Sequence, residues 1–380
     1  MPLHNRPSRS AEVCLANRLA LITAVFVLVG ELAVGQSAPA PGPNSDPTYQ
    51  ALRNITLGGD ALSVSNLDLK RDAATFHLHS GTVCFVAPVQ GKVTGAVFVG
   101  EGSFALKPPS DVERRSLKLL SRSDEFNETF THLVLRFTDS TYDELKKAGT
   151  TGGSSCDAGL LKDSQNAMRH SHEMKYNLDA RILADVLRGS SGQLFVAFVH
   201  GKRYNDKELF VIDPHGAPDV APEDVELMTY DENKTGIWTA FRSANSSSEG
   251  VVRTIQIEHH QLETTIEKSG NILGKATTTF ISRAKELRAV PFDLFPSLRV
   301  QSVVGEGNQP LAFIQEDKHA DSDFWVILPK TLSAGEKYTI ITTYGGKEAV
   351  TNEGNGNYFP VARDNLAIRR GDRLGSLCPQ

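Results

Sequence analysis

Residues 328–346 read LPKTLSAGEKYTIITTYGG, and this stretch is the strongest indication of the fold in the 380-residue chain. An apolar run ends at Pro329, a turn containing Gly335 follows, and a second apolar run extends from Tyr338 to Tyr344. Proline and glycine favour turns, whereas runs rich in β-branched and aromatic residues favour strands. We therefore expect two strands joined as a hairpin of a β-sandwich.

The chain on both sides of this stretch, between residues 250 and 362, continues the same pattern. Short apolar runs recur without long helices between them, which favours an antiparallel β-sandwich over alternating strands and helices. The expected strands are Val251–Ile257, Gln261–Ile266, Lys275–Ser282, Leu298–Val304, Leu311–Gln315, Phe324–Leu328 and Tyr338–Tyr344. A serine-rich segment at 245–250 marks the predicted boundary with an earlier domain.

Residues 49–245 predict a β-rich domain with two or so short helices. The expected strands, bounded by glycines and prolines, are Thr75–Ser80, Thr82–Ala87, Val93–Val99, Phe104–Leu106, His132–Phe137, Leu194–His200 and Glu208–Ile212. A capping box of Thr141 and Glu144 begins one predicted helix, and apolar residues at helical spacing between Leu178 and Leu187 predict another. The expected fold class is mainly β, with two domains.

The first 35 residues have the features of a secretory signal peptide. Arginines precede an apolar run from Leu19 to Gly35, and small residues at Ala33 and Gly35 form a cleavage site. A proline-rich linker is expected at 36–48, and the folded part is then secreted or periplasmic. The alternative is a retained membrane anchor, although Glu31 shortens the apolar run below the ~20 residues of a spanning helix.

Charge and cysteine content limit the partners and the kinds of site that the chain is expected to have. The formal net charge is −5, and no dense basic block precedes the last dozen residues, so nucleic acid is not an expected partner. Cleavage of the leader leaves Cys84, Cys156 and Cys378. Cys84 lies in an apolar strand and is interpreted as a buried thiol rather than a metal ligand. A Cys84–Cys156 disulfide stays open as an alternative, because sequence alone does not decide pairing.

No zinc site is predicted in the chain. A zinc hydrolase needs two histidines one helical turn apart with a carboxylate beside the first, and after His172 and Glu173 the second histidine is replaced by Tyr176. His170 and His172 could form a pair, but no acid at a characteristic distance supports it.

Two further histidine pairs are interpreted as structural. His77 and His79 alternate in a predicted strand, so they point to the same face and are expected to face solvent. His259 and His260 are neighbours in a strand, so they point to opposite faces and cannot hold one ion together.

Three motifs resemble catalytic or nucleotide-binding signatures only superficially. Gly100–Ala105 matches a dinucleotide-binding pattern but precedes a strand, so a hairpin turn is expected there. The segment Gly189–Gly192 follows a helix, unlike a nucleophile elbow. Asp213 and His215 are expected in a type I turn that closes a strand, with an acid–base pair as the alternative. We therefore assign no catalytic, cofactor-binding or metal residue.

The stretch 328–346 resembles the end of the N-terminal β-domain of the gluzincin aminopeptidases, the aminopeptidase N family. There a strand ends in Leu-Pro, a turn carries Ala-Gly-Glu, and the next strand ends in a Tyr and Gly signature. Residues 354–365, GNGNYFPVARDN, resemble a version found in bacterial members with an extra N-terminal domain, and residues 49–245 resemble that extra domain. The resemblance implies a zinc metallopeptidase family, with zinc bound in a separate catalytic domain.

The chain departs from the family in ways that bear on activity. The GxMEN loop, the HExxH motif and the distant glutamate of the catalytic domain do not occur in these 380 residues. After residue 362 the resemblance stops, and 363–380 form a basic irregular tail. We expect premature termination or a shifted reading frame there, with a natural disordered tail as the alternative.

Three hypotheses of function follow. The first is a secreted non-catalytic portion that serves as scaffold and cleft wall for a catalytic metallopeptidase domain, and it predicts an apolar patch on the second domain. The second is a stand-alone secreted module that binds peptide or glycan. The third is a hydrolase of unfamiliar architecture that uses His170 with His172, or Asp213 with His215.

Overall fold

The computed structural model describes residues 41–170, 176–204, 207–216, 223–231, 234–244, 253–317, 323–347, 349–352 and 358–360. The chain divides into two units, 1–39 and 40–380, and the first lies outside the described residues. The predicted signal peptide, the start of the linker, the boundary at 245–250 and the tail at 363–380 also lie outside them. These assignments stay predictions. In the described part of the chain, no helix is both long and apolar enough to cross a lipid bilayer.

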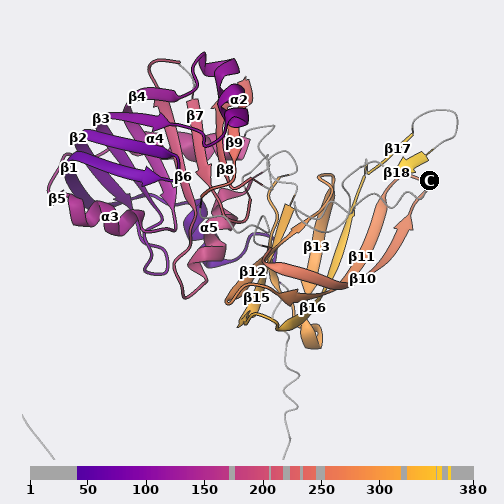
Figure 1. Cartoon of the computed structure of the whole chain (residues 1–380). Helices are drawn as coiled ribbons and strands as arrows, with labels where there is room; N and C mark the ends of the chain where they lie inside the picture. The colour runs from indigo at the N-terminus through magenta and orange to yellow at the C-terminus, as the bar shows by residue number, and fades with distance from the viewer. Residues whose placement is uncertain are drawn as a thin grey trace, which may run out of the picture. The chain divides into compact units, whose positions relative to one another are not determined.

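A nine-stranded antiparallel sheet occupies most of the first half of the chain (Figure 1). Its order is β5-β1-β2-β3-β4-β6-β7-β8-β9. The strands are β1 (Leu57–Arg71), β2 (Ala74–Val86), β3 (Gly95–Leu106), β4 (Phe126–Phe137), β5 (Thr150–Thr151), β6 (Phe195–Gly201), β7 (Lys207–Ile212), β8 (Val225–Asp231) and β9 (Lys234–Phe241). Neighbours are mostly consecutive in sequence, and the mainly β prediction is confirmed.

Two glycines lie where the sequence predicted breaks between strands. Gly81 faces Gly100 across β2 and β3, and both strands continue through these positions. A Cβ on Gly100 would lie 2.2 Å from the Ser80 carbonyl oxygen, and one on Gly81 would lie 2.5 Å from that of Val99. The glycines therefore permit close approach of two backbones, and the predicted hairpin turn at Gly100–Ala105 is wrong.

Five α-helices accompany this sheet in the described part of the chain. They are α1 (Pro47–Arg53), α2 (Asp111–Ser121), α3 (Thr141–Ala148), α4 (Ala158–His170) and α5 (Leu178–Val186). The predicted helices are confirmed as α3 and α5, whereas α1, α2 and α4 were not predicted. Helix α2 did have a local signal, because the Ser110 hydroxyl accepts a hydrogen bond from the Val112 amide at 3.3 Å.

The capping box predicted for α3 does not form. Thr141 is the first helical residue rather than the cap, and its hydroxyl donates to Asp139 and accepts from Arg71. Glu144 binds Arg71 as well, at 3.1 Å. The arginine from β1 therefore recruits the two side chains that a capping box would have paired with backbone amides.

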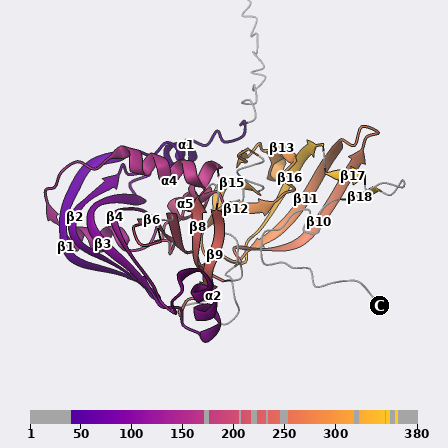
Figure 2. The same cartoon turned by 90° about the horizontal axis from the view of Figure 1, so that it is seen from above.

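The two faces of the sheet pack against different layers. Alternate residues diverge, so that Val97 packs with the helices while Phe98 packs into an aromatic core on the opposite face. Helices α1, α4 and α5 lie on the Val97 side (Figure 2), and α2 and α3 contribute Leu117 and Leu145 to the other. Every residue of α5 is buried, so its charged side chains need partners within the protein.

Two small sheets enclose a separate core in the second half, as predicted for a sandwich. The first has the order β10-β11-β16-β13 and the second β12-β15-β14. Their strands are β10 (Ile255–Ile266), β11 (Ile272–Ser282), β12 (Leu287–Asp293), β13 (Leu298–Val304), β14 (Ala312–Ile314), β15 (Asp323–Leu332) and β16 (Lys337–Gly346). A 3-10 turn, Glu306–Asn308, follows β13, and β17 (Val350–Asn352) pairs with β18 (Tyr358–Pro360).

The stretch 328–346 forms a corner of this sandwich and not the predicted hairpin. Strand β15 belongs to one sheet and β16 to the other, so the two do not pair. The Glu336 amide donates to the Ser333 carbonyl oxygen at 3.0 Å, and Gly335 has a φ of 86°, as at the third residue of a type II turn. Local signals identified the strands and the turn, but the sheet to which each strand belongs depends on distant partners.

A disulfide joins Cys84 of β2 to Cys156, just before α4. The interpretation of Cys84 as a buried thiol is therefore wrong, and the pairing that the sequence left open is the one found. Cys378 lies outside the described residues.

Candidate functional site

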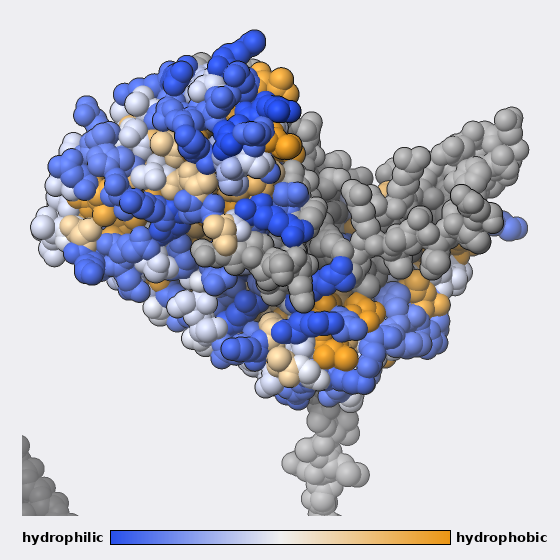
Figure 3. Space-filling model, in the orientation of Figure 1, coloured by the Kyte–Doolittle hydropathy of each residue, from blue (hydrophilic) through white to orange (hydrophobic). Residues whose placement is uncertain are grey.

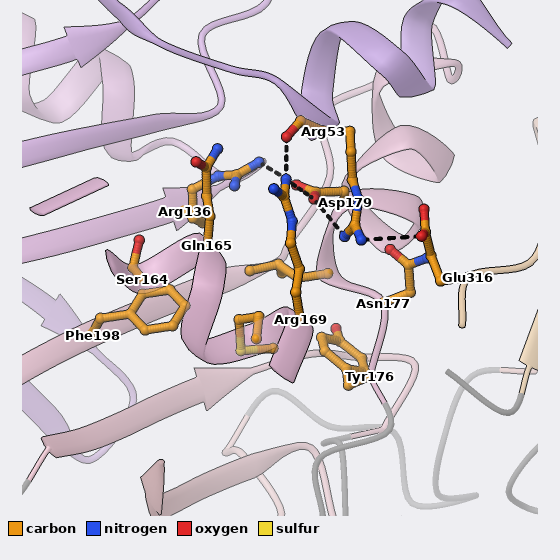
Figure 4. Close-up of a pocket in the computed structure, with 12 residues that line it drawn as sticks. Arg53, Arg136, Ser164, Gln165, Arg169, Tyr176, Asn177, Asp179, Phe198 and Glu316 are labelled. Carbon is orange, nitrogen blue, oxygen red and sulfur yellow. Dashed lines mark hydrogen bonds and ion pairs between the residues drawn. The ribbon is translucent and has the colours of Figure 1, made fainter. Parts of the chain in front are cut away.

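Five charged side chains surround a small cavity where α1, α4, α5 and β4 meet residue 316 (Figure 4). Two guanidinium groups flank the Asp179 carboxylate, with Arg136 Nη2 at 3.2 Å from Oδ1 and Arg169 Nη2 at 3.4 Å from Oδ2. Arg53 Nη1 lies 3.6 Å from the same carboxylate, and its Nη2 lies 3.1 Å from Glu316 Oε2. We call this group the arginine pocket.

The arginine pocket is held in place by backbone and tyrosine contacts. Arg169 donates to the Arg53 carbonyl oxygen, and Arg136 Nε donates to that of Thr94 at 3.4 Å. The Tyr49 hydroxyl donates to Glu316 Oε1 at 2.5 Å. Burial, and then the negative charge of Glu316, raise the pKa of Tyr49 above its usual value, so the phenol stays a hydrogen-bond donor.

A second cluster of buried charges lies on α5. Arg181 binds Asp213 through two nitrogens, with Nε to Oδ2 and Nη2 to Oδ1 both 2.9 Å, and its Nη1 lies 2.9 Å from Asp185. The Tyr176 hydroxyl donates to Asp213 at 2.6 Å. Burial alone would raise the pKa of Asp213, but Arg181 lowers it to about 2. Asp213 is thus ionised near neutral pH and poorly suited to accept a proton there.

The Asp213 turn predicted from the sequence is confirmed. The Gly216 amide donates to the Asp213 carbonyl oxygen at 2.9 Å, and the His215 amide donates to Asp213 Oδ1 at 2.9 Å. His215 Nε2 lies 3.4 Å from a nitrogen of Arg188. The turn brings Asp213 and His215 together, but Arg181 engages both carboxylate oxygens, which argues against the acid–base pair that was the alternative.

The histidines of the sequence analysis are placed as follows. His77 and His79 share one face, as predicted, with ring centroids 4.3 Å apart, and His77 contacts Asp68. The ring of His260 lies 2.8 Å from the Thr278 hydroxyl. Across the residues that are described, no cluster of three or more histidine, cysteine, aspartate or glutamate side chains could hold a metal ion.

Two other motifs of the sequence analysis remain: the structure describes the first, and the second lies outside the described residues. The Gly189–Gly192 segment follows α5, as expected, and there Ser190 donates to Glu286 at 2.9 Å. His172 and the side chain of His170 lie outside the described residues.

Sequence reasoning missed the arginine pocket. Its members come from five separate segments, and no local pattern connects them. The nearest signal was in α5, where Asp179, Arg181 and Asp185 lie among the apolar residues that predicted the helix. Their burial depends on layers packed on both sides of the helix.

Comparison with known proteins gives a partial likeness. No sequence-family model and no curated protein matches the chain. Solved structures include the M1 zinc metallopeptidase of Deinococcus radiodurans, at 23% identity over 27% of this chain and 23% of that chain, with a TM-score of 0.23. A two-domain M1 zinc metallopeptidase mutant bound to L-arginine is 25% identical over 27% of this chain and 22% of that one, with the same TM-score. The chain thus spans less than a quarter of these proteins, and about a quarter of it is similar to them in structure.

Proposed function

We propose that this chain is the non-catalytic β-rich front portion of an exported zinc aminopeptidase-like protein. Its sandwich serves as scaffold and as one wall of a peptide cleft for a catalytic zinc domain supplied by a different polypeptide segment. The observation that carries the proposal is the corner at 328–346, because its sequence is one of the stretches that resemble the aminopeptidase N family, and the structure describes it in full.

The residues of that resemblance have defined roles in the sandwich. Leu328 and Tyr338 are buried in the core between the two sheets, and Gly335 takes the positive φ of the turn. Glu336 accepts the Ser333 amide at 3.0 Å and pairs with Lys330 at 2.5 Å. These residues form a core and a turn, which supports a scaffold role rather than a chemical one.

Part of the sandwich surface is suited to a partner domain. Strand β10 lies at the edge of its sheet, and its residues 261–266 are exposed on both faces. Leu262 and Ile266, on the core-facing side, are 43% and 62% exposed. Figure 3 shows hydrophobic residues at the surface in this region and over α2. An edge strand with exposed apolar side chains favours covering by another chain or domain.

The disulfide between Cys84 and Cys156 supports export. Disulfides form and persist mainly in oxidising compartments, and they are rare in the cytosol of most organisms. The proposed location of the mature chain is the periplasm or the outside of the cell, and the disulfide and the leader sequence support it.

The test uses the purified chain with one equivalent of zinc and an aminoacyl 4-nitroanilide substrate. We expect no turnover above background, and turnover that a chelator removes would contradict the proposal.

A second arm fuses the chain to the catalytic domain of an M1 zinc metallopeptidase. We expect the fusion to raise the melting temperature of that domain, and we expect Leu262→Lys with Ile266→Lys to remove this gain. The matched control is Leu119→Lys, on an exposed position of α2, which should retain it.

A further inference from the structure

The arginine pocket contains more positive than negative charge in a confined space. Three guanidinium groups face two carboxylates, which leaves one positive charge uncompensated among the pocket residues. The side chains of Arg136 and Asp179 are 3% and 8% exposed, and those of the other three charged residues are 17–20% exposed, so water screens these charges only in part. An unbalanced charge in such a place is costly unless a counter-ion is bound.

One donor in the pocket lacks an acceptor. The Nε atom of Arg169 is buried and makes no hydrogen bond to a described residue, although Nη2 of the same group binds Asp179. Buried polar atoms are hydrogen-bonded in nearly all proteins, and those without a protein partner usually contact a water or an ion. The unpaired donor and the surplus charge therefore arise from the same group of side chains.

The size of the cavity limits what can enter. Its volume is about 20 Å³, which is little more than the ~10–15 Å³ that one water needs. Met168, Leu178 and Phe198 form its apolar walls, and a low-polarity wall strengthens the attraction between an ion and a guanidinium group. A phosphate or a whole amino acid is too large, whereas a halide or a single carboxylate group fits.

We propose that the arginine pocket binds one small monovalent anion, a halide or a carboxylate group, between Arg136 and Arg169. The anion neutralises the surplus positive charge and accepts a hydrogen bond from Arg169 Nε. It thereby stabilises the junction of α1, α4 and α5 with residue 316. This site is independent of the zinc-domain proposal and can exist whether or not that proposal holds.

The experiment measures the melting temperature of the intact chain at constant ionic strength. The reference anion is MES, a sulfonate too bulky to enter the cavity. Chloride or formate replaces it in increasing amounts. We expect a saturable rise of about 1–4 °C at ten times the dissociation constant. A response to chloride alone identifies a halide site, and a response to formate identifies a carboxylate site.

The variant Arg169→Gln removes the surplus charge and should abolish the anion-dependent rise. The control Arg115→Gln, on the exposed side of α2, should respond as the natural chain does. Equal responses in the natural chain and Arg169→Gln, or no response in the natural chain, would overturn the proposal. If Arg169→Gln does not fold, bromide-soaked crystals of the natural chain decide the matter. An anomalous peak between Arg136 and Arg169 supports the site, and its absence at saturating bromide refutes it.

Discussion

At the residue scale, Arg181 and Asp213 form a buried ion pair between α5 and the turn that follows β7. Arg181 is 1% exposed and Asp213 is fully buried, and three nitrogen–oxygen contacts of 2.9–3.0 Å join them. Removing one partner of a buried ion pair leaves the other charge without compensation. The stability of the fold therefore depends on both residues together.

We expect Asp213→Ala to lower the free energy of unfolding by about 3–5 kcal/mol, because Arg181 then retains only Asp185. Urea denaturation followed by circular dichroism measures the change. Glu125→Ala is the control, since Glu125 and its partner Lys107 are 46% and 66% exposed, and it should cost under about 1 kcal/mol. A loss below about 1 kcal/mol for Asp213→Ala would show that the pair contributes little.

The lowered pKa of Asp213 also predicts that the free energy of unfolding depends on pH. Its pKa is lowered to about 2 in the folded chain, against ~3.9 in an unfolded one. A lowered pKa stabilises the fold above about pH 4, and the stabilisation is lost as the pH falls through about 4 toward 2. We expect the stability difference between the natural chain and Asp213→Asn to narrow by about 2 kcal/mol over this interval. A constant difference in urea unfolding from about pH 5 to about pH 2 would contradict it.

At the element scale, the continuity of β2 and β3 depends on facing glycines. Gly81→Ala places a Cβ 2.5 Å from the Val99 carbonyl oxygen, and we expect it to cost about 1–3 kcal/mol. Gly59→Ala is the matched control, because Gly59 lies in β1 of the same sheet and a Cβ added there would have no atom within 4 Å. That variant should be neutral or slightly stabilising. Thermal or urea unfolding compares the two, and equal effects would argue against a close approach of the strands.

The disulfide ties β2 to the start of α4 across 72 residues. The chain-entropy account gives a stabilisation of about 4 kcal/mol for a loop of this length. We expect dithiothreitol to lower the melting temperature of the natural chain but not that of the variant Cys84→Ser with Cys156→Ser. A melting temperature that the reductant leaves unchanged in the natural chain would show that the bond does not form.

At the scale of the whole molecule, the helical layer joins the two sheet systems within residues 40–380. One hydrophobic cluster includes Leu183 of α5, Val196 of the nine-stranded sheet, and Ile314 and Trp325 of the sandwich. Arg53 of α1 pairs with Glu316, and Ser190 with Glu286. These shared contacts favour a single cooperative unfolding transition.

The chain has two tryptophans. Trp238 lies in the aromatic core of the nine-stranded sheet, and Trp325 lies in the cluster that this sheet shares with the sandwich. We expect the variants Trp238→Phe and Trp325→Phe, each with one remaining fluorophore, to unfold at the same urea concentration. Ile314→Ala, at a fully buried position, should lower both midpoints through a loss of about 2–5 kcal/mol. If Ile314→Ala left the Trp238 signal unchanged, the two halves would unfold independently.

The candidate site could not be predicted to the same degree as the fold. Local signals identified α5 and the Asp213 turn, because helical spacing and turn residues act over a few positions. Helix α3 was also identified, although the capping box that predicted it does not form. The arginine pocket draws Arg53, Arg136 and Asp179 from segments far apart, and no spacing in a sequence encodes such a meeting. For the same reason, the sequence alone did not decide that Cys84 pairs with Cys156, which is 72 residues away.

The sequence alone determined that this protein is mainly β, where most strands lie, and that residues 328–346 contain a strand, a turn and a strand. These properties follow from side-chain alternation and turn chemistry, which are local. The tertiary structure decided that β15 and β16 belong to different sheets, that Gly81 and Gly100 continue their strands, and that α5 is buried with its charges. The reason is that strand pairing and burial depend on residues that are distant in the chain and adjacent only after folding.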